Sequence, residues 1–220
     1  MLMLNNTFSS GLFLALILII FFILKLEYLS DPLFWDELGV YGKGIFQMAD
    51  TSPSLRPQAL PPHVSRGHPL FYSFYHASII KLFGKSLFSL RLSNLIFALS
   101  LPLLIYFYQK QIINKDCAII SVIFILTQPI YFVQASLVLP EIMLTTFLLA
   151  GTFSFSNKKY LLSSFFFGLS ILTKETALPI PFVLAAFEFI KYYRRSGKMS
   201  ITRFLSINLT YLIPFTVFGI

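Results

Sequence analysis

The chain has 220 residues, of which 56% are hydrophobic, 17% aromatic and only 12% charged. A soluble domain of this size cannot hide so much apolar surface, so the composition predicts an integral membrane protein. The formal net charge of +8 would also suit a nucleic-acid binder. The basic residues lie between apolar stretches, however, as topology signals of membrane proteins do, and this argues against nucleic acid as a partner.

Seven apolar stretches are candidates for transmembrane helices, because about 20 apolar residues cross the roughly 30 Å hydrocarbon layer. They cover approximately residues 11–29, 92–108, 117–137, 142–155, 160–173, 177–193 and 201–220. Short polar turns join most of them. We therefore expect an all-α fold, a polytopic membrane helix bundle of about seven spans.

Alternation of seven spans sorts the charged residues onto two sides of the membrane. One side receives nine basic residues: Lys110, Lys115, Lys158, Lys159, Lys191, Arg194, Arg195, Lys198 and Arg203. The short loops opposite contain only Lys174, so the positive-inside rule makes the nine-residue side cytoplasmic. The outer side, periplasmic or extracytoplasmic, then holds seven of the nine carboxylates: Glu27, Asp31, Asp36, Glu37, Asp50, Glu141 and Glu175.

The one long connection follows the first span on the outer side. Its middle, residues 53–62, contains four prolines and predicts an extended crossing. The flanking segments 36–50 and 68–84 have apolar residues at helical spacing, with polar and aromatic residues among them, which favours helices lying in the membrane interface. We expect one domain, 1–220, in three parts: the first span at 1–29, the outer loop at 30–91 and the remaining spans at 92–220.

Several short motifs occur in an order that is similar to a known family. They are "LFWDELGVYG", "GHPLFYSFYHASIIKLFG", "SLFSLRLSNLIFAL", "LVLPEIMLTTFLLAG" and "GLSILTKETALPIPFVL". From about residue 33 to residue 189, the chain resembles the polyprenyl-phosphate-dependent glycosyltransferases of the GT-C superfamily. The relevant branch contains protein O-mannosyltransferases, lipid A aminoarabinose transferases and RgtA/B/C/D-like enzymes. Members generally continue for several hundred residues, so we expect an N-terminal portion or a truncated relative.

The resemblance implies transfer of a sugar from a polyprenyl-phosphate donor to a hydroxyl of a lipid, glycan or protein acceptor, with inversion, in the inner or plasma membrane. Such a displacement needs a base for the acceptor proton and cations beside the leaving phosphate. Asp36 has the first position of the family's acidic pair and is expected to be the base. Glu37 would hold a metal, the acceptor or a basic neighbour. The alternative for Asp36 is a helix cap.

Three basic residues are expected at the donor phosphate: Arg66, His68 and Lys174. Phosphate oxygens accept charge-assisted hydrogen bonds, which suits all three side chains. The alternatives are nonspecific contact of Arg66 and His68 with lipid headgroups, and pairing of Lys174 with its neighbour Glu175.

Tyr41, Glu141 and Glu175 are expected to contact the substrate or a metal. Glu141 could complete a divalent-cation site with the acidic pair, because hard cations bind carboxylate oxygens. It could equally be a charge favoured at the start of a helix. Tyr41 could stack on a sugar face, although aromatic residues are common at membrane interfaces. No metal is assigned as required.

Two other function classes fit parts of the pattern. A transporter or lipid flippase also carries ionisable groups among its spans, but these tend to lie near the bilayer midplane. The carboxylates of this chain lie at span ends and in one loop, which favours the enzyme. An inactive, truncated relative of the glycosyltransferases that acts as a noncatalytic membrane partner is the third alternative.

Overall fold

The computed structural model describes residues 7–194, and in this range the chain forms helices and no β-strand. The all-α expectation is confirmed for this part of the chain. The expected span 201–220, like the basic residues Arg195, Lys198 and Arg203, lies outside the described residues.

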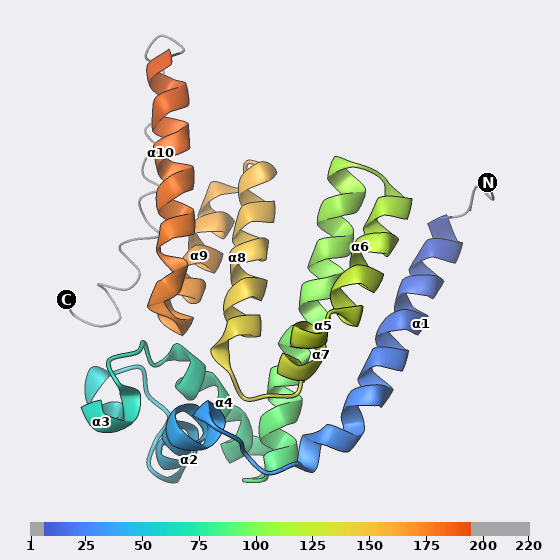
Figure 1. Cartoon of the computed structure of the whole chain (residues 1–220). Coiled ribbons are helices and arrows are strands. Elements are labelled where there is room, and N and C mark those ends of the chain that lie inside the picture. The colour runs from blue at the N-terminus through green and yellow to red at the C-terminus, as the bar shows by residue number, and fades with distance from the viewer. Residues whose placement is uncertain (1–6, 195–220) are drawn as a thin grey trace.

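Ten α-helices are described (Figure 1): α1 (Thr7–Leu26), α2 (Gly42–Asp50), α3 (Pro62–Ser65), α4 (Phe71–Phe83), α5 (Leu87–Ile112), α6 (Lys115–Thr127), α7 (Pro129–Gln134), α8 (Pro140–Ser156), α9 (Tyr160–Thr173) and α10 (Pro179–Arg194). Short turns lie between them: the 3₁₀ turns η1 (Glu27–Ser30), η3 (Pro57–Ala59) and η4 (Glu175–Ala177), and the π-helical turn η2 (Glu37–Tyr41).

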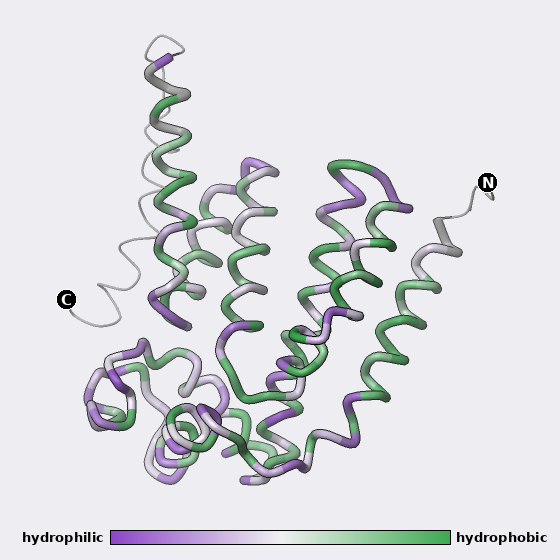
Figure 2. Tube along the Cα trace, in the orientation of Figure 1, coloured by the Kyte–Doolittle hydropathy of each residue, from purple (hydrophilic) through white to green (hydrophobic). Residues whose placement is uncertain are grey.

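The helices form two groups. The long helices α1, α5, α6, α8, α9 and α10 run up and down in Figure 1, and α2, α3 and α4 gather at one end of them. We call this second group the crossing layer. It contains the loop that the sequence places on the outer side. Helix α5 joins the two groups, because it contacts α4 as well as α6 and α8. Figure 2 shows polar residues in the crossing layer and in the turns at the opposite end, with apolar residues between them.

Two described helices are long and apolar enough to cross a membrane, Ser10–Ser30 and Leu87–Ile112. Two further apolar helices are shorter, Tyr160–Thr173 and Glu175–Phe187. Length and composition therefore support a membrane protein without establishing the expected seven spans.

The expected third span is not one continuous helix. It divides into α6 and α7 at Gln128, whose backbone is extended with ψ 124°. Pro129 follows, and the residue before a proline avoids the helical conformation.

Helix α5 begins earlier than the apolar pattern predicts. Gly84, with a φ of 105°, follows the end of α4. Ser86 then caps α5, since its hydroxyl accepts a hydrogen bond from the backbone N–H of Ser89 over 3.1 Å. The helix thus starts at Leu87 rather than at residue 92, and Arg91 lies within it rather than in the loop.

Both helices expected in the outer loop are present, as η2 with α2 and as α4. The proline-rich middle differs from the expected extended crossing, because Pro57 and Pro62 each begin a short helical turn. Proline suits the first turn of a helix, where its fixed φ is already helical and its missing N–H is not needed.

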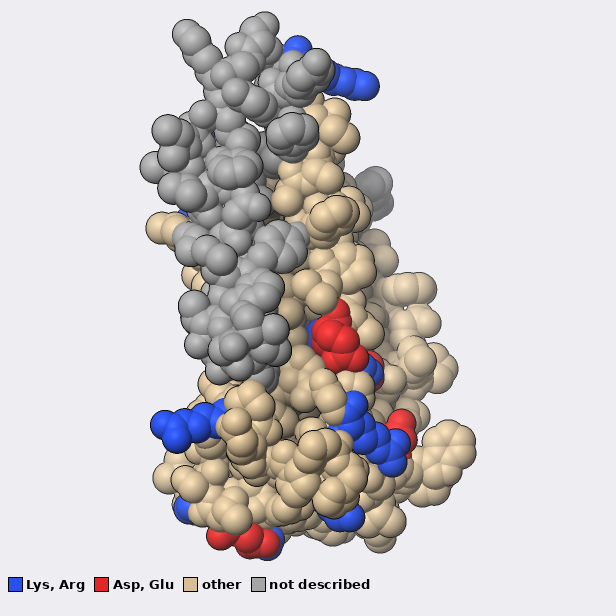
Figure 3. Space-filling view, turned by 90° about the vertical axis from the view of Figure 1, so that its left-hand side faces the viewer, with Lys and Arg blue, Asp and Glu red and all other residues tan. Residues whose placement is uncertain are grey.

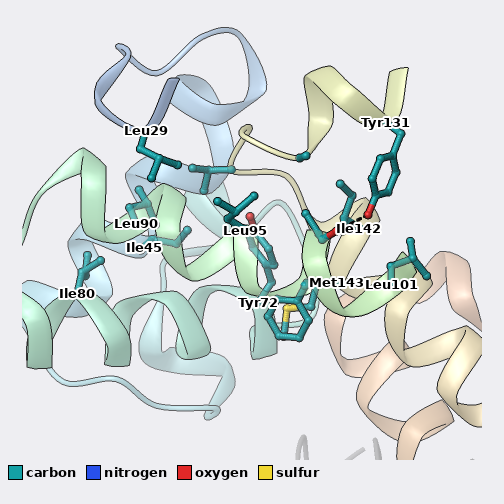
Figure 4. Close-up of a cluster of buried hydrophobic side chains, with 14 of the residues drawn as sticks. Leu29, Ile45, Tyr72, Ile80, Leu90, Leu95, Leu101, Tyr131, Ile142 and Met143 are labelled. Atoms are coloured by element: carbon teal, nitrogen blue, oxygen red, sulfur yellow. Dashed lines mark hydrogen bonds between the residues drawn. The ribbon is translucent and has the colours of Figure 1, made fainter. Parts of the chain in front are cut away.

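The crossing layer is packed firmly against the long helices. Figure 4 shows side chains from both groups in one apolar cluster; they include Leu29, Ile45, Tyr72, Ile80, Leu90, Leu95 and Met143. Because these side chains are buried together, the cluster fixes where the polar residues of the crossing layer meet the ends of α8 and α9.

Candidate functional site

The acidic pair lies in an unusual stretch of backbone between η1 and α2. Trp35 has a φ of 48°, a left-handed conformation that is uncommon for a residue other than glycine. The π-helical turn η2 begins immediately after Asp36. Both features occur preferentially at functional sites, where the surrounding structure holds a side chain in a defined direction.

Gly42, the glycine of the "YG" motif, makes this turn possible. A Cβ at this position would lie 2.5 Å from the carbonyl oxygen of Glu37 and 2.5 Å from Cδ1 of Leu33. Atoms cannot approach so closely without moving the backbone. The glycine is therefore required by the close packing of the turn against the chain that precedes it.

Glu37 is buried, with 1% of its surface exposed, and both of its carboxylate oxygens are used. Oε1 accepts a hydrogen bond from the backbone N–H of Val138 over 2.6 Å. Oε2 accepts from the backbone N–H of Phe34 and from Nη2 of Arg91, each over 3.0 Å. Glu37 therefore holds a basic neighbour, one of the three roles expected for it.

Arg91, only 2% exposed, links three segments of the chain. Besides Glu37 on η2, it donates to the carbonyl of Pro32 over 2.9 Å and to the carbonyl of Ser136 after α7. The sequence interpretation assigned no role to Arg91. A detectable signal was present, since a single charge within the apolar run "SLRLSNLIF" is expected to have a partner.

Asp36 differs from Glu37 both in its exposure and in its hydrogen-bond partners. Its side chain is exposed and makes no capping hydrogen bond, so the cap alternative is not supported. Among the described residues, no hydrogen bond or ion pair involves its carboxylate. The carboxylate is therefore available to a substrate.

Two ion pairs bring the remaining candidates together. Nζ of Lys174 lies 2.7 Å from Oε1 of Glu141, and Nδ1 of His68 lies 3.1 Å from Oε1 of Glu175. Lys174 and Glu175 thus pair with residues elsewhere in the chain and not with each other. The local reason is the extended backbone of Lys174, with φ −160° and ψ 136°, which turns consecutive side chains to opposite sides.

Tyr41 lies between these groups. Its ring stacks on that of His68 at a centroid distance of 6.3 Å and an interplanar angle of 26°. It meets the ring of Tyr72 edge-on at 5.6 Å. These contacts join η2, the loop before α4 and α4 itself. The aromatic face is therefore held among the polar groups of the site rather than out in the interface.

The pKa of Tyr41 reports its surroundings. Burial raises this pKa; the ammonium of Lys174 acts in the opposite direction, and the carboxylates of Glu141 and Asp36 raise it further. Charges from the residue before η2, from α8 and from the end of α9 therefore act on a single hydroxyl. Tyr41 remains a neutral hydrogen-bond donor at neutral pH.

Two buried polar atoms of the site, the hydroxyl of Tyr72 and Oε2 of Glu141, have no hydrogen-bond partner among the described residues. Burial raises the pKa of Tyr72 well above its ordinary value, and the carboxylates of Glu141 and Glu37 add to the effect. Buried polar atoms of proteins are normally paired, so these two are suited to a polar ligand or water.

The structure gathers most of the residues that the sequence singled out: Asp36, Glu37, Tyr41, His68, Glu141, Lys174 and Glu175. On the face shown in Figure 3, acidic and basic side chains meet between the long helices and the crossing layer. Arg66 does not join them through any described contact. Its side chain is exposed, and its φ of 51° ends α3 in a left-handed conformation.

A preassembled metal centre is not evident within residues 7–194, where no three His, Cys, Asp or Glu side chains gather to hold a metal ion. Glu37 and Glu141, two members of the expected cation site, are instead paired with Arg91 and Lys174. Within this part of the chain, the carboxylates are arranged around basic side chains.

Residues 67–219 match the family model of dolichyl-phosphate-mannose-protein mannosyltransferases. The match covers more than half of the chain; it includes His68, Arg91, Glu141 and Lys174 and begins after Asp36. No curated protein and no solved structure matches the chain. The chain belongs to the dolichyl-phosphate-mannose-protein mannosyltransferase family, and it is a membrane-integral glycosyltransferase of the GT-C kind.

Proposed function

We propose that this glycosyltransferase moves a sugar from a polyprenyl-phosphate donor to an acceptor hydroxyl at the outer face of the membrane, with Asp36 as general base. One observation carries the proposal. Of the four carboxylates at the site, Glu37, Glu141 and Glu175 each face a basic side chain, whereas Asp36 is exposed and unpaired among the described residues.

The proposed reaction is a single displacement. The Asp36 carboxylate takes the proton of the acceptor hydroxyl as the acceptor oxygen attacks the anomeric carbon. The bond between that carbon and the phosphate oxygen breaks, its electron pair leaves with the polyprenyl phosphate, and the configuration inverts. A positioned general base of this kind contributes on the order of 10²–10⁴-fold to the rate.

Lys174 and His68 are the groups proposed to bind the phosphate. Burial alone would lower the pKa of Lys174, but the hydrogen bond and charge of Glu141 outweigh it, so the pKa is raised and Lys174 is an ammonium at neutral pH. Glu141 and Glu175 hold these two side chains in place in the absence of a donor. The phosphate would take over these contacts, and its growing charge in the transition state would strengthen them.

Glu37 is proposed to position the base rather than to act as one. Its carboxylate accepts three hydrogen bonds and lies one residue from Asp36, so the Glu37–Arg91 pair fixes the turn from which Asp36 projects. Tyr41, stacked on His68, presents a hydroxyl to the same space and is proposed to contact the sugar.

Charge in the short connections between the long helices supports action at the outer face. Away from the crossing layer, the described helix ends and turns carry Lys110, Lys115, Lys158, Lys159 and Arg194. The short turn between α9 and α10, at the site, carries Lys174 alone as a basic residue. Basic loops stay in the cytoplasm, so the site would face away from it.

A transfer assay in reconstituted vesicles tests the proposal. We expect label to pass from radiolabelled polyprenyl-phosphate sugars, and not from nucleotide sugars, into a glycosidic product. Asp36→Asn should reduce this transfer by at least about 100-fold. The matched control is Asp50→Asn, which alters only an exposed ion pair with Lys85 and should keep the activity.

The same assay separates the proposal from its rival. Label that crosses the bilayer without forming a glycosidic bond would establish a transporter or flippase instead. Transfer from nucleotide sugars alone would contradict the proposed donor.

A further inference from the structure

A pocket of about 290 Å³ lies at the end of the first apolar helix. Residues from α1, η1, α5 and α7, and from the loop before η2, line it. Of the candidate site residues, only Glu37 reaches this pocket. Its chemistry is therefore separate from that of Asp36, Lys174 and His68.

Lys25, one residue before the end of α1, is the main polar feature of the pocket. It is 1% exposed, and its ammonium lies 3.3 Å from the ring centroid of Phe132 and 5.0 Å from that of Tyr28. No described carboxylate or carbonyl is within hydrogen-bond distance of it. An ammonium has three N–H donors, and ring faces satisfy them less well than oxygen atoms do.

Arg91 adds a second unused donor. Its Nε is buried and has no hydrogen-bond partner within residues 7–194, although both terminal nitrogens are paired. Glu37 cannot serve Lys25 as well, because its two oxygens already accept three hydrogen bonds. Asp31 lines the pocket but is exposed and forms no ion pair with Lys25. The pocket is therefore suited to an added anion.

The rim of the pocket is apolar. Phe34 and Val133 line it and are largely exposed, and Trp35, which is 81% exposed, stacks on Phe34 at a centroid distance of 5.8 Å. Exposed rings at the end of a membrane span lie at headgroup depth. A ligand that suits both the buried Lys25 ammonium and the apolar rim has an anionic head and a hydrocarbon tail.

We infer that this pocket binds the phosphate headgroup of a membrane lipid, with the phosphate on Lys25 and the tail along Phe34 and Val133. The inference does not rest on the proposed transfer reaction, because the pocket excludes its catalytic residues. Glu37 lines the pocket, so an occupied pocket would restrain the Glu37–Arg91 pair.

Native mass spectrometry of the full chain, purified in detergent, tests the inference. The probes are phosphatidylglycerol, a polyprenyl phosphate, diacylglycerol and inorganic phosphate. We expect one or both phosphate lipids to stay bound, and Lys25→Met to weaken this binding by at least about tenfold, since it removes a charged donor and keeps the side-chain volume. The control Lys81→Met removes an exposed charge outside the pocket and should bind like the parent protein.

A second variant keeps the inference testable if Lys25→Met does not fold. Val133→Trp fills the rim without changing any charge and should also weaken binding by about tenfold or more. A preference for one of the two lipids identifies the natural source of the phosphate. Unchanged binding in a folded Lys25→Met or Val133→Trp variant overturns the inference, as does equally tight binding of diacylglycerol or inorganic phosphate.

Discussion

The Glu37–Arg91 pair should be the most sensitive polar contact in the described part of the chain. Glu37→Ala would leave the Arg91 guanidinium buried without a counter-charge. It would also leave the backbone N–H groups of Phe34 and Val138 without their hydrogen-bond acceptor. Removing one partner of a buried pair costs about 3–5 kcal/mol. The matched control is Glu175→Ala, which breaks an exposed pair with His68 and should cost about 1 kcal/mol or less.

Unfolding in mixed detergent micelles measures these costs. Trp35 is the single tryptophan of the chain and lies two residues before Glu37, so its fluorescence reports on the turn itself, and circular dichroism reports on the helices. In a double-mutant cycle, Glu37→Met combined with Arg91→Met should cost much less than the sum of the single changes, because no lone charge stays buried. The reasoning is refuted if the costs are additive, or if Glu37→Ala is no worse than Glu175→Ala.

Three further predictions follow from the geometry of the site. Gly42→Ala should slow transfer about 10²-fold, because its Cβ would force the carbonyl of Glu37 to move; an unchanged initial rate would contradict this. Lys174→Met should weaken donor binding roughly 10–100-fold in an equilibrium assay, whereas a purely structural Lys174 would leave donor affinity unaltered. Burial acts to raise the pKa of Glu175, but hydrogen bonds from its own backbone N–H and from His68 outweigh burial, and the pKa is lowered. The stability that Glu175 contributes, measured against Glu175→Gln, should therefore be present above the ordinary carboxyl value of 4.5 and be lost as the pH falls from there through the lowered pKa; a difference in melting temperature that persists at still lower pH would refute this.

The sequence predicts where the helices lie better than it predicts the residues at which they begin and end. Apolar runs mark where residues avoid water, so they located α1, α8, α9 and α10 within a few residues. Capping and proline decide where a helix starts or breaks, and these act independently of hydropathy. The hydroxyl of Ser86 extends α5 toward its N-terminus, and Pro129 separates α7 from α6 within a continuous apolar run.

The sequence grouped the candidate site residues but could not predict their contacts. Charge alternation placed Glu141, Lys174 and Glu175 at the same end of the helices as the acidic pair. Which side chain meets which depends on packing across α8, α9 and the crossing layer, which no local pattern encodes. The neighbours Lys174 and Glu175 were weighed as a mutual pair, and each instead binds a residue at least 33 positions away.

Arg91 shows why burial must be known before a charge can be interpreted. In the sequence it resembles one more basic residue at the edge of an apolar span. In the fold it is among the largest fully buried side chains and joins the acidic pair to the segment before α8. Its role depends on the early start of α5, which placed it inside the helix.

Single-turnover transfer by Asp36→Asn is the most direct measurement of the role proposed for Asp36. Donor and acceptor are supplied at saturation, and product formation is followed in one catalytic cycle, alongside donor affinity. A general base predicts donor affinity equal to that of the parent protein, with the chemical step slowed at least about 100-fold. An undiminished single-turnover rate in Asp36→Asn would show that another group removes the acceptor proton.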